Sequence, residues 1–215
     1  MTILVLDKKC YLSVDSRYTF GIMLRFKILV VGDPGIGKTT LLHAIMENRF
    51  VAEVSILGGN SKNIAMSPDG KVIRYELWET VGQEEYDTLR RHSYRNTDVF
   101  LVCFSTVDPK SFESVSEKFI SEIIHHCPET PFLLVGTQLD LKEDRATVDR
   151  LASKNQAPIS SDVGLEIAKQ VGASKYLECS SLTMEGVKNV NDQTILEALK
   201  RDETSEKKMK TCTIS

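Results

Sequence analysis

Short apolar runs alternate along this chain with longer segments in which apolar residues recur at helical spacing. Residues 99–104 and 132–135 are continuous apolar runs, which is typical of strands buried on both faces of a parallel sheet. Residues 26–31 form a similar run that stops at Gly32. Residues 73–78 alternate between apolar and polar positions and follow a Ser-Pro-Asp-Gly sequence with the chemistry of a hairpin turn. We predict a strand at each place.

The intervening segments complete the pattern. We predict a further short strand at 176–179, an exposed, charged helix at about 143–156, and apolar-striped helices at 38–48, 112–124, 165–171 and 187–199. Strands that alternate with helices predict an α/β fold, with a mostly parallel six-stranded sheet covered by helices on both faces. In such folds ligands bind at the carboxyl ends of the strands.

Composition narrows the functional classes. The chain has 215 residues, of which 41% are hydrophobic, and a formal net charge of -3, so a general nucleic-acid binder is disfavoured. Five cysteines without a C-x-x-C pair disfavour both a disulfide framework and a structural zinc site. No apolar run approaches the length of a transmembrane helix, and no secretory leader pattern is present.

Residues 32–39, Gly-Asp-Pro-Gly-Ile-Gly-Lys-Thr, fit the phosphate-loop pattern G-x-x-x-x-G-K-[ST] between a predicted strand and a predicted helix. The glycines let successive backbone N–H groups face one centre at the positive end of the helix dipole. Lys38 is placed to reach the outer phosphates, and the Thr39 hydroxyl to ligate Mg²⁺. The candidate phosphate-binding residues are Gly35, Ile36, Gly37, Lys38, Thr39 and Thr40.

Two later segments favour guanine over adenine. Thr137-Gln138-Leu139-Asp140 follows one predicted strand, and Glu178-Cys179-Ser180-Ser181-Leu182 includes the end of the next. The Asp140 carboxylate can accept both the N1–H and the exocyclic amine of guanine, a pattern that adenine does not offer. If the protein were a P-loop kinase or ATPase, neither segment would have an evident function. Thr137, Gln138 and Asp140 are therefore candidate base-binding residues.

At this point the sequence resembles the Rho family of Ras-superfamily small GTPases, in its Rac-like branch, over roughly residues 23–199. The most specific stretches are 77–86 (Leu-Trp-Glu-Thr-Val-Gly-Gln-Glu-Glu-Tyr), 97–100 and 176–182, together with the insert helix. The resemblance implies a P-loop G domain that binds GTP, GDP and Mg²⁺, with guanine contacts from Phe50, Ser180, Ser181 and Leu182. It further implies that Gly82 donates its N–H to the γ-phosphate and that Gln83 orients the attacking water as the catalytic residue.

Four positions depart from the family pattern near the γ-phosphate. Pro34 replaces a glycine and has no N–H. Glu79 replaces the aspartate that acts indirectly on Mg²⁺, and Val81 replaces an alanine. Leu57 falls where the family has a metal-ligating threonine, although Ser55 and Ser61 are near.

Because hydrolysis depends on positioning here, these departures predict slow GTP hydrolysis with nucleotide binding retained. Gln138 also replaces the lysine of the family's base-binding motif, which we call the base motif and which corresponds to residues 137–140 here. A pseudo-GTPase with a fixed nucleotide state or fast exchange remains the alternative. Effectors, exchange factors and GTPase-activating proteins are implied partners, and the protein is expected to be a monomer.

The ends of the chain carry separate predictions. Cys212-Thr213-Ile214-Ser215 has the C-a-a-X form of a prenylation site, preceded by three lysines, which predicts reversible attachment to the cytoplasmic face of membranes. Residues 201–215 are predicted to be a flexible basic tail. The G domain is predicted to span residues 25–200. Residues 1–24 form an N-terminal extension that the family does not explain: an added strand, a regulatory arm or a consequence of start-codon choice.

Overall fold

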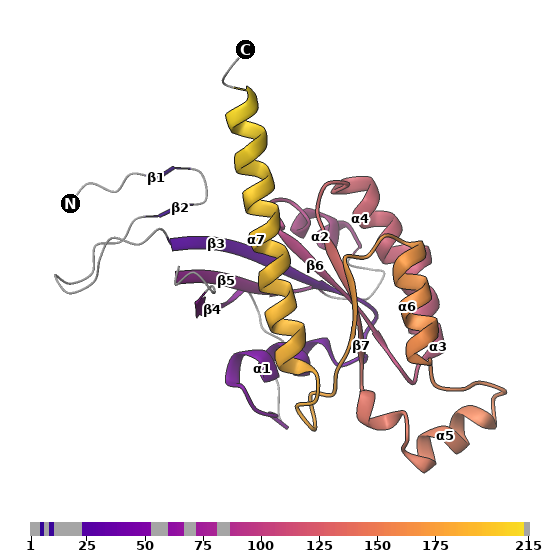
Figure 1. The fold of residues 1–215 in the computed structure, drawn as a ribbon. Helices are drawn as coiled ribbons and strands as arrows, with labels where there is room; N and C mark the ends of the chain where they lie inside the picture. The colour runs from indigo at the N-terminus through magenta and orange to yellow at the C-terminus, as the bar shows by residue number, and fades with distance from the viewer. Residues whose placement is uncertain are drawn as a thin grey trace.

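The computed structural model describes residues 5–6, 9–10, 23–52, 60–66, 72–80 and 87–212. Within these ranges eight strands form one sheet, and six of them, the number predicted, have the order β4-β5-β3-β6-β7-β8 (Figure 1). All its strand pairs are parallel except β4 with β5. The strands are β3 (Met23–Val31), β4 (Asn60–Met66), β5 (Val72–Glu79), β6 (Val99–Ser105), β7 (Phe132–Thr137) and β8 (Lys175–Glu178).

Helices cover both faces of this sheet, which confirms the predicted α/β fold (Figure 1). The described helical segments are α1 (Lys38–Glu47), α2 (Asp87–Ser93), α3 (Pro109–Ser114), the π-helix η2 (Val115–Ile120), α4 (Ser121–His126), the 3-10 helix η3 (Leu139–Leu141), α5 (Arg145–Ala152), α6 (Ser161–Gln170) and α7 (Val187–Cys212). Segments α3, η2 and α4 run on from one another and correspond to the single helix predicted at 112–124.

Two apolar cores hold the layers together. On one face, Leu41 of α1 and Val190 of α7 pack in a cluster with Ile28 of β3. On the other, Phe119 and Ala168 pack in a cluster with Phe100 of β6. The buried strand β6 has all its residues inaccessible to solvent, as its unbroken apolar run predicts.

β3 begins at Met23, two residues before the predicted N-terminal boundary of the G domain at residue 25. Two short strands precede it, β1 (Val5–Leu6) and β2 (Lys9–Cys10). The second pairs antiparallel with β3, with Cys10 opposite Met23. Part of the extension therefore adds strands to the sheet, and pairing at this edge lets β3 start earlier than its apolar run indicates.

α7 continues to Cys212, through the first part of the segment that was predicted to be a flexible tail from residue 201. Residues 201–212 are rich in Glu and Lys and contain neither glycine nor proline, so nothing in the sequence stops the helix. Figure 1 shows α7 extending beyond the sheet toward the C-terminus. No helix in the described part of the chain is both long enough and apolar enough to cross a membrane.

Candidate functional site

The phosphate loop joins β3 to α1 in the geometry that the motif requires. Gly35 and Gly37 have φ of 78° and 90°, a left-handed conformation that side chains rarely adopt. At Gly32 an added Cβ would lie 2.3 Å from the carbonyl oxygen of Cys103. Ile36 is buried beneath the loop and Pro34 is exposed. The loop is thus anchored by one apolar side chain while its backbone faces outward.

The N-terminus of α1 is open to an anion. Gly37 is the N-cap residue, and no side chain makes a capping hydrogen bond there. The first backbone N–H groups of a helix need partners from outside it, and the positive end of the dipole lies at the same place. Residues Lys38, Thr39 and Thr40 supply these N–H groups, so this end of α1 suits a phosphate.

Lys38 places a buried cation at the centre of the loop. Its ammonium donates hydrogen bonds to the carbonyl oxygens of Gly32, at 2.9 Å, and Asp33, at 2.6 Å. Burial lowers the pKa of the Lys38 ammonium, although the charges of Glu79 and Asp33 act in the opposite direction. The loop therefore holds this ammonium with neutral carbonyl partners, ready to bind the negative charge of phosphates.

Thr39 and Glu79 bring two oxygen ligands together beside the loop. The Thr39 hydroxyl donates a 2.5 Å hydrogen bond to Glu79 Oε1. The other carboxylate oxygen, Oε2, is buried and has no hydrogen-bond partner among the described residues. A buried unpaired carboxylate oxygen beside a hydroxyl is a donor set that suits Mg²⁺, which prefers oxygen ligands. These two residues therefore fit the ion.

The base motif and the loop after β8 meet through direct contacts. Ser180, which is fully buried, donates a 2.5 Å hydrogen bond from its hydroxyl to Asp140 Oδ1. The Leu139 N–H donates to the carbonyl of Cys179, and the Thr137 hydroxyl donates to the carbonyl of Ile36. The three predicted segments thus form one cradle, with Asp140 oriented by Ser180.

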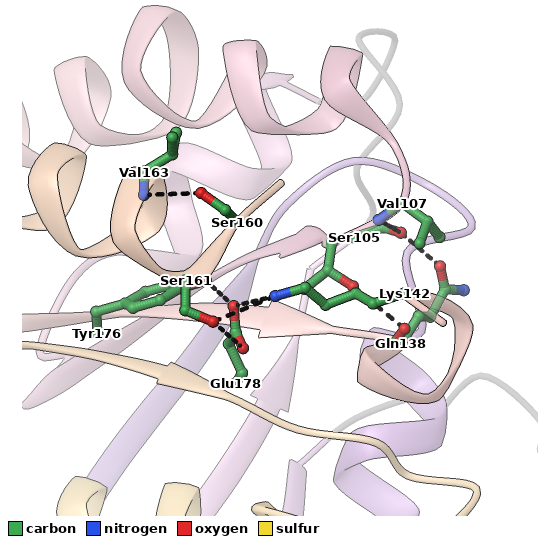
Figure 2. A network of polar contacts seen from close by, with 10 residues as sticks. Ser105, Val107, Gln138, Lys142, Ser160, Ser161, Val163, Tyr176 and Glu178 are labelled. Carbon is green, nitrogen blue, oxygen red and sulfur yellow. Dashed lines mark hydrogen bonds and ion pairs between the residues drawn. The ribbon is translucent and has the colours of Figure 1, made fainter. Parts of the chain in front are cut away.

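Ser105 was not predicted as a site residue, yet it fixes the position of Gln138. Its hydroxyl donates a 2.6 Å hydrogen bond to Gln138 Oε1 (Figure 2). The Gln138 amide reaches the Gly35 carbonyl at 3.4 Å. Thr106 donates to the Gln138 carbonyl. Ser105 is the last residue of β6, and its place at the carboxyl end of a parallel strand was the signal that could have identified it.

A second polar network stabilises the loop that follows β7. Figure 2 shows the Glu178 carboxylate among Lys142, Ser161 and Tyr176, with the Lys142 ammonium 2.9 Å from it. Burial raises the pKa of Glu178, but the hydrogen bonds from Tyr176, Lys142 and Ser161 outweigh it, so the net pKa lies below its usual range. The network connects β8 with the segment that leads into α5 and with the start of α6.

The remaining predicted residues lie apart from these contacts or outside the described part. Phe50 and Ser181 are half-buried, and Leu182 is 56% exposed. Ser61 lies in β4, and Cys212 is the last residue of α7. Outside the described residues lie the catalytic candidate Gln83 and four other predicted positions: Ser55, Leu57, Val81 and Gly82.

Comparison with known protein families agrees with this geometry. The family model described as "Ras: Ras family" matches residues 27–200, which is most of the chain. That range contains the phosphate loop, the base motif and the loop after β8. Members of this family bind GTP and GDP, generally together with Mg²⁺. The chain therefore belongs to the Ras family, and its domain is that of a small GTP-binding switch protein.

Proposed function

We propose that this chain is a Rho/Rac-type small GTPase that binds guanine nucleotide tightly, hydrolyses GTP slowly and signals from the cytoplasmic face of membranes. Signalling to the cytoskeleton is the role that resemblance to the Rho family suggests. The observation that carries the proposal is the contrast around Thr39. The residues proposed to bind the phosphates and the base form an ordered cradle around Thr39. The Thr39 hydroxyl itself is held by Glu79, whose side chain is one methylene longer than the family's aspartate.

The binding half of the proposal follows from the cradle. Lys38 and the N-terminus of α1 bind the phosphates, and Asp140 accepts two hydrogen bonds from guanine while Ser180 holds it in place. Thr39 and Glu79 would hold Mg²⁺, which neutralises phosphate charge when bound. Phe50, Ser181 and Leu182 remain proposed base contacts on the strength of the family resemblance.

The slow step follows from the switch side. Gln83 is the residue proposed to orient the attacking water. Hydrolysis also requires that the metal and the residues around the γ-phosphate are correctly positioned relative to that water. Glu79 reaches the Thr39 hydroxyl directly. That hydroxyl keeps its lone pairs for Mg²⁺, but its position is fixed by a carboxylate one methylene longer than the family's. Leu57 offers no ligand, and Pro34 offers no N–H to a ligand. Each loss of 1.36 kcal/mol of transition-state stabilisation slows the reaction about tenfold.

The Rho/Rac assignment is supported by the inserted helix α5. It begins after Asp144, whose side chain accepts a hydrogen bond from the Thr147 N–H, and lies between β7 and α6. The predicted helix at about 143–156 is present as Arg145–Ala152. Its place in the chain matches the inserted helix that, by the resemblance described above, distinguishes Rho proteins from other small GTPases.

Membrane attachment is proposed through Cys212. A single prenyl chain gives weak, reversible binding, and the lysines at 207, 208 and 210 fall below a usual basic cluster of about four to eight. A second contact with the membrane is therefore needed for stable residence. A Cys212→Ser variant is expected to lose its membrane fraction in cells, and an unchanged fraction would overturn the lipid anchor.

The alternative, a pseudo-GTPase with a fixed nucleotide state or fast exchange, is favoured by the same Thr39–Glu79 contact. Identification of the nucleotide that co-purifies with the full chain, followed by GDP and GTP affinities with and without Mg²⁺, separates the two. The proposed GTPase carries guanine nucleotide, and Mg²⁺ tightens its binding. Equal binding of both nucleotides, indifferent to Mg²⁺, would instead support the pseudo-GTPase.

A further inference from the structure

A cavity of about 470 Å³ lies at the end of the sheet where β6 and β7 begin. It is lined by the loop between α2 and β6, by the loop between α4 and β7, and by Arg201 of α7. The nucleotide site lies at the opposite, carboxyl ends of these strands. The cavity is therefore separate from the site described above.

Two cations hold one wall of this cavity in shape. The Lys27 ammonium donates hydrogen bonds to the carbonyl oxygens of Ser93, at 2.5 Å, and Arg95, at 2.9 Å. The Arg201 guanidinium donates to the Thr97 carbonyl at 2.5 Å. The loop after α2 is thus fixed from β3 and from α7. A wall that is already ordered loses little conformational entropy when a ligand binds.

The cavity carries an excess of positive charge. Its lining contains Arg91, Arg95 and Arg201 against the single carboxylate of Glu129. Arg91 lies 3.9 Å from Glu122 and is 47% exposed at its side chain; Arg201 lies 3.8 Å from Asp98 and is 27% exposed. With the charged neighbours included, the cations Lys27, Arg90, Arg91, Arg95 and Arg201 outnumber the carboxylates Glu76, Asp98, Glu122 and Glu129 by one.

We propose that this cavity binds the phosphorylated headgroup of an anionic membrane lipid. Guanidinium groups match phosphate oxygens with two parallel hydrogen bonds, and three arginines line this cavity. The volume falls in the range of small-ligand sites, about 300–1,000 Å³. We assign the phosphate to a lipid because α7 runs from the cavity at Arg201 to the proposed lipid anchor at Cys212, a helical rise of about 16 Å. The cavity therefore lies close to the proposed membrane anchor.

The cavity loops and the C-terminal half of α7 lie at the same end of the molecule (Figure 1). The choice of a lipid rests on the proposed membrane association. A headgroup bound there would supply the second contact that one prenyl chain and three lysines lack. It would also turn the nucleotide site, at the other ends of the strands, away from the bilayer.

Sedimentation with vesicles tests the proposal on the full, unprenylated chain loaded with GDP, so that failure of the prenyl anchor does not affect the result. Phosphatidylcholine vesicles that contain phosphatidylinositol bisphosphate are compared with phosphatidylserine vesicles of equal charge. We expect preferential binding to the phosphoinositide vesicles, with soluble inositol trisphosphate as a competitor. Arg95→Gln should weaken binding about fivefold, and Arg91→Gln with Arg95→Gln about 25-fold, or about 1 kcal/mol for each arginine.

A matched pair of exposed arginines far from the cavity, Arg49→Gln with Arg145→Gln, is the control and should retain binding. Thermal unfolding and GDP affinity of all variants should match the parent chain. Equal binding to both kinds of vesicle, equal losses in the control pair, or binding of inositol trisphosphate without binding to vesicles would each overturn the proposal. If the parent chain is not prenylated in cells but still binds the vesicles, only the proposed lipid anchor at Cys212 would be rejected.

Discussion

The two sides of the nucleotide site differ in how their polar groups are satisfied. On the base side, Asp140 accepts a hydrogen bond from buried Ser180, and Gln138 is held between Ser105 and Gly35. On the metal side, Glu79 makes one hydrogen bond with Thr39 and keeps a second, buried oxygen without a described partner. The protein's own groups satisfy the polar atoms on the base side, whereas the buried Glu79 oxygen on the metal side is available to a cation.

That difference is the basis of our proposal that binding and hydrolysis separate in this chain. Binding uses groups that the fold already fixes at the carboxyl ends of β3, β6 and β7. Hydrolysis uses a metal ligand set and a water-orienting residue whose positions must agree closely. Substitutions on the metal side are therefore expected to change the reaction rate while nucleotide binding survives.

The largest effect is expected on the base side. Asp140→Ala removes two charge-assisted hydrogen bonds to guanine, each worth about 1.5–3 kcal/mol, so GDP affinity should fall at least about 100-fold. Discrimination against ATP should fall with it. Competition titrations with a fluorescent nucleotide measure both. Asp149→Ala, which removes an exposed carboxylate in α5, is the control; equal losses in the two variants would contradict the role of Asp140.

The next effect concerns stability rather than affinity. Because the folded pKa of Glu178 lies below its usual value, its contribution is present above about pH 4.5 and is lost as pH falls through the folded pKa. Glu178→Gln should lower the free energy of unfolding by about 1–2 kcal/mol at pH 7 and flatten its decline below pH 4.5. Denaturant unfolding across pH measures this.

Glu143→Gln, at an exposed position near the same loop, should leave that profile unchanged. An identical pH dependence in the parent chain and Glu178→Gln would show that the network in Figure 2 adds nothing to stability.

On the metal side, we expect substitution of Glu79 to change the Mg²⁺ requirement about tenfold. Glu79→Asp shortens the side chain by one methylene, which should break the 2.5 Å bond to Thr39 and let the Thr39 hydroxyl adjust its position to the ion. The Mg²⁺ concentration that half-maximally slows GDP release should then fall about tenfold, equivalent to about 1.4 kcal/mol. Glu76→Asp on the same strand is the control. An unchanged Mg²⁺ requirement would argue that Glu79 does not restrain Thr39.

The smallest effect is expected at Gln138. Ser105→Ala and Gln138→Ala should each speed GDP release about fivefold, and the double variant should be no faster than either, because both remove the same contact. Stopped-flow release rates complete the double-mutant cycle, with Ser114→Ala, at a half-buried position in α3, as the control. Fully additive effects would mean that Ser105 acts independently of Gln138.

Much of this organisation could be predicted from the sequence because it follows local patterns. The apolar run of β6 and the glycine spacing of the phosphate loop predict their structures directly. The Ser105–Gln138 bond could not be predicted, since it joins residues 33 positions apart and depends on the parallel register of β6 and β7. The length of α7 was missed because its polar end lacks the apolar stripe that marks the rest of the helix.

Single-turnover GTP hydrolysis tests the central claim most directly, with bound GTP measured in the same samples. The parent chain is compared with a Glu79→Asp, Leu57→Thr double variant, which restores the family's residues at two positions. We predict that both proteins bind GTP and that the double variant hydrolyses it at least about tenfold faster, equivalent to about 1.4 kcal/mol of transition-state stabilisation. Equal, ordinary rates in the two proteins would contradict the account.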